Sequence, residues 1–327
     1  MIPKKTILVT NRYEGGPLAL LQSFVPEGMA LRMPDRVTRE ALIEEIQDAD
    51  YLLASGRVRI CDEILAAGER LKMIQRIGVG LDALDLDAIR RRQIPLYVNR
   101  GVNAESVAEQ SLLLMLACLR RLPETDANTR AGVWIKEPQG VRTHELRGKT
   151  VGLVGMGNIA RRLCELLNGF GVTILYNSRS RLSEEQEQER GLRWADREEL
   201  FRESDIVSLH CSLNDETKGL INRETLSLMK DGAILINTAR GQLVRTQDLA
   251  EALRNGKLAC AGLDVHEIEP IPEDYALKAL PNVILTPHIA GITQESFSAM
   301  MGRALRNIEL YDRGELGAIE EYRYKSR

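Results

Sequence analysis

A glycine-rich turn after an apolar run constrains the fold of this chain more than any other feature of its sequence. The apolar run 151–154 leads directly into Gly155-Met156-Gly157-Asn158-Ile159-Ala160, which fits the pattern G-x-G-x-x-G/A. A helical pattern covers residues 158–168, and a second apolar run follows at 172–176. The first glycine permits a tight turn, the second lets a pyrophosphate approach the backbone, and the helix N-terminus supplies amides and a positive dipole. This segment predicts a Rossmann dinucleotide-binding domain. The residues expected beside the cofactor are Gly155, Gly157, Asn158 and Ile159.

Apolar runs alternate with helical patterns along most of the chain, as in proteins with parallel sheets. Before residue 103 we expect strands at 7–9, 51–53, 73–74 and 96–98, with helices at 38–47, 61–67 and 85–92. After residue 149 we expect strands at 150–154, 172–176, 206–209, 233–237, 259–264 and 283–286. This second series is typical of a doubly wound nucleotide-binding sheet, and the fold class is therefore α/β.

Two long helical patterns indicate the domain boundaries. The length of 327 residues exceeds what one hydrophobic core usually fills, so we expect two domains. Residues 103–122 are small or apolar on most sides, which predicts a buried helix connecting the domains. Residues 293–312 are helical in pattern and follow the last expected strand, so they return to the first domain. We expect one domain from residues 1–102 and 290–327, and a dinucleotide-binding domain from residues 103–289.

Composition and charge exclude several classes of protein. The 44 Lys and Arg residues nearly balance the 47 Asp and Glu residues, so the net charge of −3 favours no nucleic-acid partner. The apolar run near the N-terminus is too short for a signal peptide or a membrane span, which predicts a cytoplasmic protein. The five cysteines contain no C-x-x-C spacing, so we expect reduced core thiols and neither a disulfide framework nor a metal site.

The position that reads the ribose of a bound dinucleotide has no acidic residue. An acid at the end of the second strand would bind the 2′-hydroxyl of NAD, but this chain has Asn177, Ser178 and Arg179 there. Arginine and serine suit a 2′-phosphate, and Arg181 adds a second cation if the loop folds back. We therefore expect NADP as the preferred cofactor, with NAD as the alternative.

Ionisable side chains follow several of the expected strands, at the edge where such sheets bind ligands. Arg240 follows the strand at 233–237, and its planar guanidinium is suited to a carboxylate. His288 follows the strand at 283–286, and an imidazole exchanges protons near neutral pH. A carboxylate beside the imidazole would stabilise its protonated form. Both Glu267 and Glu269 flank the same loop, and the residue pattern does not choose between them.

Several motifs, in matching order, resemble those of the D-isomer-specific 2-hydroxyacid dehydrogenase family, which includes glyoxylate/hydroxypyruvate reductases and phosphoglycerate dehydrogenases. The similarity extends from about residue 73 to residue 294. Besides the glycine turn, the motifs are Gly78-Val79-Gly80-Leu81-Asp82, Gly101-Val102-Asn103-Ala104-Glu105-Ser106-Val107-Ala108-Glu109, Leu146-Arg147-Gly148-Lys149-Thr150-Val151-Gly152, Asn237-Thr238-Ala239-Arg240-Gly241, Gly262-Leu263-Asp264-Val265, Glu269-Pro270 and Thr286-Pro287-His288. The resemblance implies a flavodoxin-like substrate domain beside the Rossmann domain, and a homodimer.

The same resemblance assigns roles to individual residues. It implies that Arg240, Glu269 and His288 are catalytic, and that Arg240 also binds the substrate carboxylate together with the amides of Val79 and Gly80. It further implies cofactor contacts from His210, Thr238 and Asp264, of which Asp264 would bind the nicotinamide carboxamide.

The function implied is the reversible, NAD(P)-dependent reduction of a small 2-oxo acid to the D-2-hydroxy acid, with glyoxylate-like or hydroxypyruvate-like substrates favoured. Two alternatives stay open at this point. One is a non-catalytic, dinucleotide-sensing binding protein, because co-repressors resemble this family and also keep the Arg, Glu and His residues. The other is a phosphoglycerate or phosphite-type dehydrogenase with the same fold.

Overall fold

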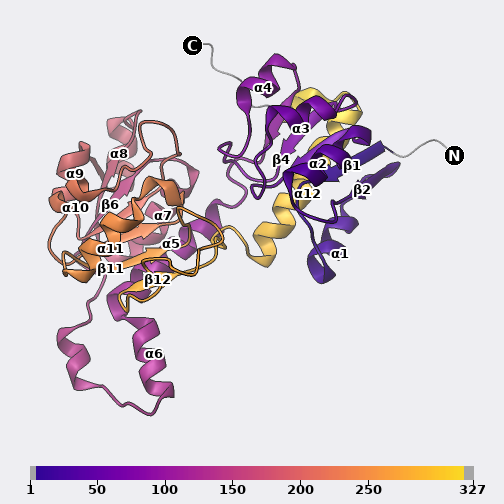
Figure 1. Cartoon of the computed structure of the whole chain (residues 1–327). Coiled ribbons are helices and arrows are strands. Elements are labelled where there is room, and N and C mark those ends of the chain that lie inside the picture. Colours follow the sequence, from indigo (N-terminus) through magenta and orange to yellow (C-terminus); the bar gives the residue numbers. More distant parts are fainter. Residues whose placement is uncertain (1–4, 320–327) are drawn as a thin grey trace. The chain divides into compact units, whose positions relative to one another are not determined.

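The computed structural model describes residues 5–319 of the chain. Residues 1–4 and 320–327, which belong to the first predicted domain, lie outside the described residues. The chain forms two compact units, Met1–Asn103 with Gln294–Arg327, and Ala104–Thr293 (Figure 1). The first unit is therefore discontinuous in sequence.

The first unit is a five-stranded parallel sheet with helices on both faces. Its strands are β1 (Lys5–Val9), β2 (Met29–Arg32), β3 (Tyr51–Ala54), β4 (Met73–Arg76) and β5 (Leu96–Val98). Their order in the sheet is β2-β1-β3-β4-β5, and every pair is parallel. This is the flavodoxin-like strand order, so that part of the predicted fold class is confirmed.

The helices of the first unit are α1 (Gly15–Ser23), α2 (Arg39–Glu45), α3 (Asp62–Ala67), α4 (Leu86–Arg91) and α12 (Gln294–Asp312), with short 3-10 turns at Ile46–Asp48 and Leu316–Ala318. The helix α1 and the strand β2 were not expected from the sequence. Within α1 only Leu21 is buried, and the helix begins at two glycines and a proline, so it lacks the usual signals of a helix start.

The C-terminal helix α12 belongs to this unit because its buried face completes the core there. Met300, Leu305 and Ile308 pack with β-strand residues on one face of the sheet, while α2, α3 and α4 cover the other face. Two buried amides add polar contacts. Asn307 of α12 donates to Oε1 of Gln75 at 3.0 Å, and the Asn99 amide donates to the carbonyl of Met300 at 2.8 Å.

The second unit is a seven-stranded parallel sheet. Its strands are β6 (Thr150–Val154), β7 (Thr173–Asn177), β8 (Leu192–Trp194), β9 (Ile206–Leu209), β10 (Ala233–Asn237), β11 (Leu258–Leu263) and β12 (Val283–Leu285). Their order is β12-β11-β10-β9-β6-β7-β8, which is the Rossmann order with one additional strand at the end. The Rossmann part of the predicted fold class is confirmed. The short edge strand β8 was not expected from the sequence.

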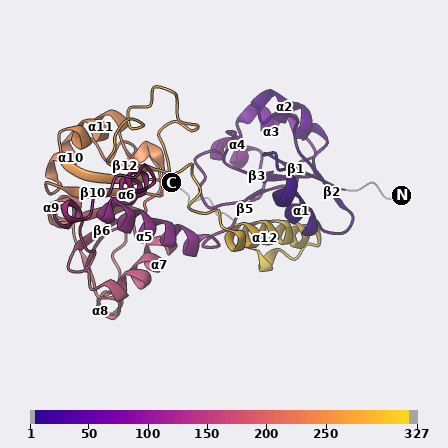
Figure 2. The same ribbon diagram turned by 90° about the horizontal axis from the view of Figure 1, so that it is seen from below.

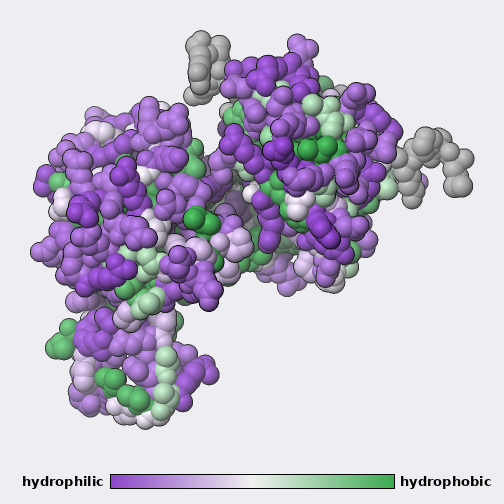
Figure 3. All heavy atoms as spheres, in the orientation of Figure 1, coloured by the Kyte–Doolittle hydropathy of each residue, from purple (hydrophilic) through white to green (hydrophobic). Residues whose placement is uncertain are grey.

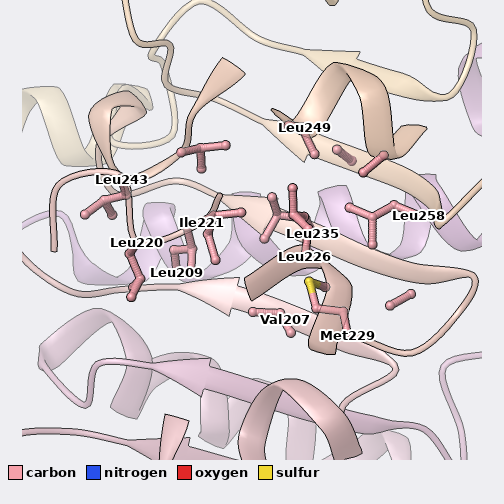
Figure 4. Close-up of a cluster of buried hydrophobic side chains, with 14 of the residues drawn as sticks. Val207, Leu209, Leu220, Ile221, Leu226, Met229, Leu235, Leu243, Leu249 and Leu258 are labelled. Carbon is pink, nitrogen blue, oxygen red and sulfur yellow. The ribbon is translucent and has the colours of Figure 1, made fainter. Parts of the chain in front are cut away.

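Helices cover both faces of this second sheet. The helices are α5 (Ala104–Arg120), α6 (Leu122–Arg130), α7 (Asn158–Leu167), α8 (Glu184–Arg190), α9 (Arg197–Glu203), α10 (Arg223–Leu228) and α11 (Thr246–Arg254), with 3-10 turns at Glu137–Val141, Asn168–Phe170 and Gly241–Leu243. The helices α5 and α7 cover one face of the sheet (Figure 2). There they bury Leu114, Met115 and Leu163. The other face carries α9, α10 and α11, where Leu226 and Leu249 join a large apolar cluster (Figure 4).

Within residues 5–319, no helix is long and apolar enough to cross a membrane.

Candidate active site

The glycine turn lies at the carboxyl end of β6 and leaves room for a phosphate group. Gly155 has a φ of +104°, and a Cβ built on it would lie 2.6 Å from the backbone carbonyl of His210. Gly157 precedes α7, whose N-terminus has no side-chain cap, and a Cβ on Gly157 would meet no protein atom within 4 Å. The turn therefore presents uncapped amides to open space, and these residues fit the pyrophosphate of a dinucleotide.

The loop after β7 contains the predicted ribose-reading residues. The Asn177 amide donates to the carbonyl of Ala195 at 2.9 Å, and the Ser178 hydroxyl donates to the carbonyl of Ser180 at 2.5 Å. Arg179 is exposed and makes no hydrogen bond or ion pair with the part of the chain that the structure describes. Its guanidinium is thus available to an anion in solution.

Arg181, the second arginine of this loop, is already engaged. Its Nε and Nη2 donate to the two carboxylate oxygens of Glu187 at 2.9 and 2.8 Å, and it lies 5.6 Å from the ring centroid of Trp194. The Arg181 guanidinium and the Tyr176 hydroxyl lower the pKa of Glu187 to about 2. Because Glu187 belongs to α8, this ion pair holds the Arg181 side chain against that helix, and the Arg181 charge is neutralised within the protein. Its suggested contact with a cofactor phosphate would require this ion pair to open.

A carboxylate and an imidazole meet at the carboxyl end of the same sheet. Nδ1 of His288 donates to Oε2 of Glu269 at 2.8 Å, and Oε1 of Glu269 accepts the backbone N–H of His266 at 2.9 Å. Desolvation raises the pKa of Glu269, but the hydrogen bonds from His288 and His266 outweigh it and lower the pKa overall. Both side chains remain accessible to solvent: 48% of the His288 side-chain surface and 36% of the Glu269 side-chain surface are exposed. The pair can therefore hold a proton and deliver it to an external molecule through Nε2.

The choice between the two glutamates of this loop is decided by the tertiary structure. Oε2 of Glu267 accepts the hydroxyl of Thr246 at 2.7 Å and the backbone N–H of the same residue at 3.2 Å. Glu267 therefore binds the start of α11, whereas Glu269 faces His288.

Asp264 holds the segment that carries His288. Its side chain is fully buried, and its carboxylate accepts the Thr286 hydroxyl at 2.5 Å and the backbone N–H groups of Ile289 and Ala290 at 2.9 and 2.7 Å. The backbone N–H of His288, a residue with a φ of +57°, donates to the Asp264 carbonyl at 2.7 Å. Asp264 thus stabilises the loop in which His288 has its positive φ. Its contact with a nicotinamide carboxamide stays a prediction.

His266 is a structural part of the site that the sequence analysis did not single out. It is buried, and its Nε2 donates to the carbonyl of Thr286 at 3.0 Å while Nδ1 accepts the Tyr275 hydroxyl at 3.4 Å. The ring therefore ties the loop after β11 to the end of β12. Only its position two residues after Asp264 could have indicated this role.

Arg240 follows β10, the neighbour of β11 in the sheet. The Asn237 side chain closes the turn by accepting the N–H of Ala239 at 3.0 Å and donating to the carbonyl of Arg240 at 2.9 Å. A Cβ on Gly241 would lie 1.9 Å from the carbonyl carbon of His266, so the Arg240 loop packs directly on the loop that leads to Glu269. Because β10, β11 and β12 are adjacent and parallel, the loops that follow them carry Arg240, Glu269 and His288 at the same end of the sheet.

The remaining predicted cofactor residues line the same edge. The hydroxyl of Thr238 shares a hydrogen bond with that of Ser111 at 2.8 Å, and Nε2 of His210 shares one with the Ser208 hydroxyl at 2.8 Å. Desolvation lowers the pKa of His210 to about 4, so this ring is neutral at pH 7. Neutral polar side chains at these positions are compatible with an uncharged nicotinamide amide.

Val79 and Gly80 lie in the first unit, after β4. Val79 is exposed, and the carbonyl of Gly80 accepts Nε of Arg76 at 2.8 Å. Nη1 of the same arginine donates to the carbonyl of Ala54 at 2.8 Å. The buried guanidinium of Arg76 thus fixes the turn whose amides were predicted to bind the substrate.

A Rossmann sheet with an open glycine turn and a carboxylate–imidazole pair at one edge defines a dinucleotide-binding protein equipped for proton transfer. Residues 112–290 match the family described as D-isomer specific 2-hydroxyacid dehydrogenase, NAD binding domain. The chain is 40% identical to a glyoxylate reductase of Aeropyrum pernix, over 85% of this chain and 84% of the relative. It is 36% identical to a hydroxypyruvate reductase of Thermotoga maritima, over 80% and 84% of the two chains.

A solved structure agrees with these relatives. A D-lactate dehydrogenase from Aquifex aeolicus, complexed with NAD and lactic acid, superimposes with a TM-score of 0.86 at 28% identity, over 98% of this chain and all of that chain. The protein belongs to the D-isomer specific 2-hydroxyacid dehydrogenase family.

Proposed function

We propose that the protein reduces a small 2-oxo acid to the D-2-hydroxy acid, and catalyses the reverse reaction, with a nicotinamide dinucleotide. The observation that carries this proposal is the 2.8 Å hydrogen bond between Glu269 and His288 on the sheet edge that also bears the glycine turn. The relatives named glyoxylate reductase and hydroxypyruvate reductase support small, polar 2-oxo acids as substrates.

Each predicted residue then has a defined role in the reaction. A reduced nicotinamide bound at the glycine turn would supply the hydride. Arg240 holds the substrate carboxylate through its planar guanidinium and polarises the neighbouring carbonyl. The amides of Val79 and Gly80 keep their predicted role in substrate binding. His288 donates a proton from Nε2 to the developing alkoxide, and Glu269 stabilises the imidazolium before that transfer. In the reverse direction His288 accepts the proton.

A panel of 2-oxo acids tests this function. Glyoxylate, hydroxypyruvate and pyruvate should each be offered with reduced cofactor, and consumption of the cofactor should be followed by its absorbance. Turnover of at least one acid supports the proposal. Cofactor binding without any turnover would instead support a dinucleotide-sensing protein, which the reductase relatives do not favour.

We further propose that NADP is preferred over NAD. An acidic residue at the ribose position would repel a 2′-phosphate, and this chain has Asn177 and Ser178 there, followed by the exposed Arg179. One charge-assisted contact contributes about 1.5–3 kcal/mol, which corresponds to a roughly tenfold to hundredfold preference for NADPH.

The test compares kcat/KM for NADPH and NADH in the wild type and in Arg179→Ala. The substitution should bring the two values close together. A suitable control is Arg202→Ala, because Arg202 is an exposed arginine near the end of α9, which precedes β9 and so lies toward the opposite edge of the sheet. Equal use of both cofactors by the wild type, or an unaltered ratio in Arg179→Ala, would exclude Arg179 from the cofactor site.

A homodimer is the third part of the proposal. The segment that follows α5 in the second unit, from α6 to the 3-10 turn Glu137–Val141, projects from the body of that unit (Figure 1). It carries the exposed apolar residues Leu122, Val133, Trp134 and Val141, and green patches mark this projection on the surface (Figure 3). Trp134 is 82% exposed and Val141 is 87% exposed. A second copy of the chain would bury this surface, and light scattering of the full-length protein measures the resulting mass.

A further inference from the structure

A cavity of about 260 Å³ lies in the second unit, at the amino ends of the strands, whereas the glycine turn lies at their carboxyl ends. It is lined where β9, β10 and β11 begin, by Ile206, Ala233 and Ala259, and by the C-terminal part of α5. No residue assigned to the proposed reduction lines this cavity. It is therefore a separate feature of the fold.

Two cysteines from different elements meet at the wall of this cavity. Cys118 lies near the end of α5, Cys260 lies on β11, and both line the cavity. Helix and strand approach closely because β11 has Gly262 beneath the helix, where a Cβ would lie 2.9 Å from Cβ of Leu114 and 3.4 Å from Sγ of Cys118. Cys260 is two residues before Gly262 on the same strand, so its side chain also faces α5, and it joins Cys118 in one buried apolar cluster. The two sulfurs are thus neighbours, although 141 intervening residues separate them in the sequence.

The surroundings make the two sulfurs chemically unequal. The hydrogen bond from Cys118 lowers the pKa of Cys260 against the effect of desolvation, and the nearby charge of Arg121 lowers it further. The same hydrogen bond and burial raise the pKa of Cys118, which keeps its proton. Cys164, a buried cysteine of α7, has no such partner within residues 5–319, and desolvation raises its pKa to about 12. Cys260 is therefore the thiol of this pair that ionises first, and the thiolate is the reactive form.

We propose that Cys118 and Cys260 form a redox-active dithiol, which a small peroxide entering the cavity oxidises to an intrachain disulfide. Both residues expose less than a tenth of their surface, so the cavity provides the route for the oxidant. This reaction is independent of the proposed reduction of 2-oxo acids.

The reaction is balanced in two steps. The Cys260 thiolate attacks one oxygen of hydrogen peroxide, the O–O bond breaks, and a sulfenic acid forms while hydroxide leaves and takes up the proton that Cys260 lost. The Cys118 sulfur then attacks the sulfenic sulfur and displaces its oxygen, which leaves as water with the Cys118 proton. Overall, two thiols and one peroxide give one disulfide and two waters, and the two electrons lost by the sulfurs reduce the peroxide.

Thiol labelling of the full-length protein tests the proposal. The reduced protein has five cysteines, and it should be exposed to hydrogen peroxide, unfolded and alkylated before mass spectrometry. We expect two fewer alkylated thiols, a protein lighter by two hydrogen atoms before labelling, and a single cross-linked peptide pair that contains Cys118 and Cys260. Both thiols should disappear at least about tenfold faster than the Cys164 thiol.

Matched variants identify the order of the two steps. In Cys118→Ser the disulfide should not form, and the sulfenic acid on Cys260 should react with dimedone. In Cys164→Ser the disulfide should form as in the wild type. The proposal is overturned if the wild-type protein keeps both thiols after Cys164 has begun to oxidise, or if the cross-link joins other cysteines. The wild-type measurement decides this even where a variant fails to fold.

Discussion

Replacing Gly157 by alanine should weaken cofactor binding and stabilise the free protein at the same time. Gly157 has φ and ψ of −84° and −168°, an extended conformation that alanine adopts without strain, and its Cβ would meet no protein atom within 4 Å. A glycine-to-alanine change at such a position stabilises a protein by about 0.4–1 kcal/mol, because the unfolded chain loses freedom. For a unit of this size, the melting temperature should rise by about 1–4 °C.

The same methyl group would occupy the space through which a phosphate approaches the amides of α7. Loss of one charge-assisted hydrogen bond costs about 1.5–3 kcal/mol, which corresponds to a roughly tenfold to hundredfold increase in Kd. Fluorescence titration with the reduced cofactor measures this Kd, and a thermal melt without cofactor measures the stability. The two quantities should move in opposite directions, which a general disturbance of the fold would not produce.

Two other glycines provide controls for this substitution. Gly169→Ala also adds a Cβ in open space, within the 3-10 turn Asn168–Phe170, and should leave the Kd unchanged. Gly155→Ala should lower the melting temperature, because its φ is +104° and the new Cβ would lie 2.6 Å from backbone atoms of His210. An unchanged Kd in Gly157→Ala would refute the placement of the pyrophosphate, and a lower melting temperature would show that the space is not open.

His288→Asn should retain cofactor affinity but lower kcat by ~10²–10⁴, the usual contribution of a positioned acid, and near wild-type turnover would remove His288 from catalysis. Glu269→Gln should move the alkaline decline of the reduction to lower pH, because the protonated imidazole loses the anion 2.8 Å away; an unchanged pH–rate profile would contradict this. Arg240→Lys should reduce kcat/KM for 2-oxo acids while the cofactor Kd stays constant, since an ammonium cannot bind a carboxylate with two parallel hydrogen bonds. An equal loss of cofactor affinity would place Arg240 at the dinucleotide instead.

Much of the fold could be predicted because it depends on local patterns. Apolar runs marked ten of the twelve strands that residues 5–319 form, within a few residues, since parallel strands buried on both faces are apolar along their length. The two missed strands, Met29–Arg32 and Leu192–Trp194, lie at sheet edges, and each buries only its first residue. An edge strand has one neighbour and less buried surface, so its sequence carries a weaker signal.

Individual side-chain partners could not be predicted in the same way. Glu267 and Glu269 are two residues apart in one loop, yet one binds Thr246 and the other His288. Arg181 was available as a cofactor ligand on sequence grounds, but the fold places Glu187 against it with two hydrogen bonds. The backbone conformation of each loop determines which way these side chains point and therefore which residues they contact. No residue pattern specifies that conformation.

The sequence by itself determined the glycine turn, the parallel strands and the residue types at the ends of β10 and β12, because these depend on short segments and on burial of apolar runs. The tertiary structure alone decided which carboxylate meets His288, how Asp264 and His266 hold its loop, and that Cys118 and Cys260 share one buried cluster. The physical reason is the order of strands in the sheet. Hydrogen bonding between β10, β11 and β12 brings together loops that are distant along the chain, and only that pairing defines their contacts.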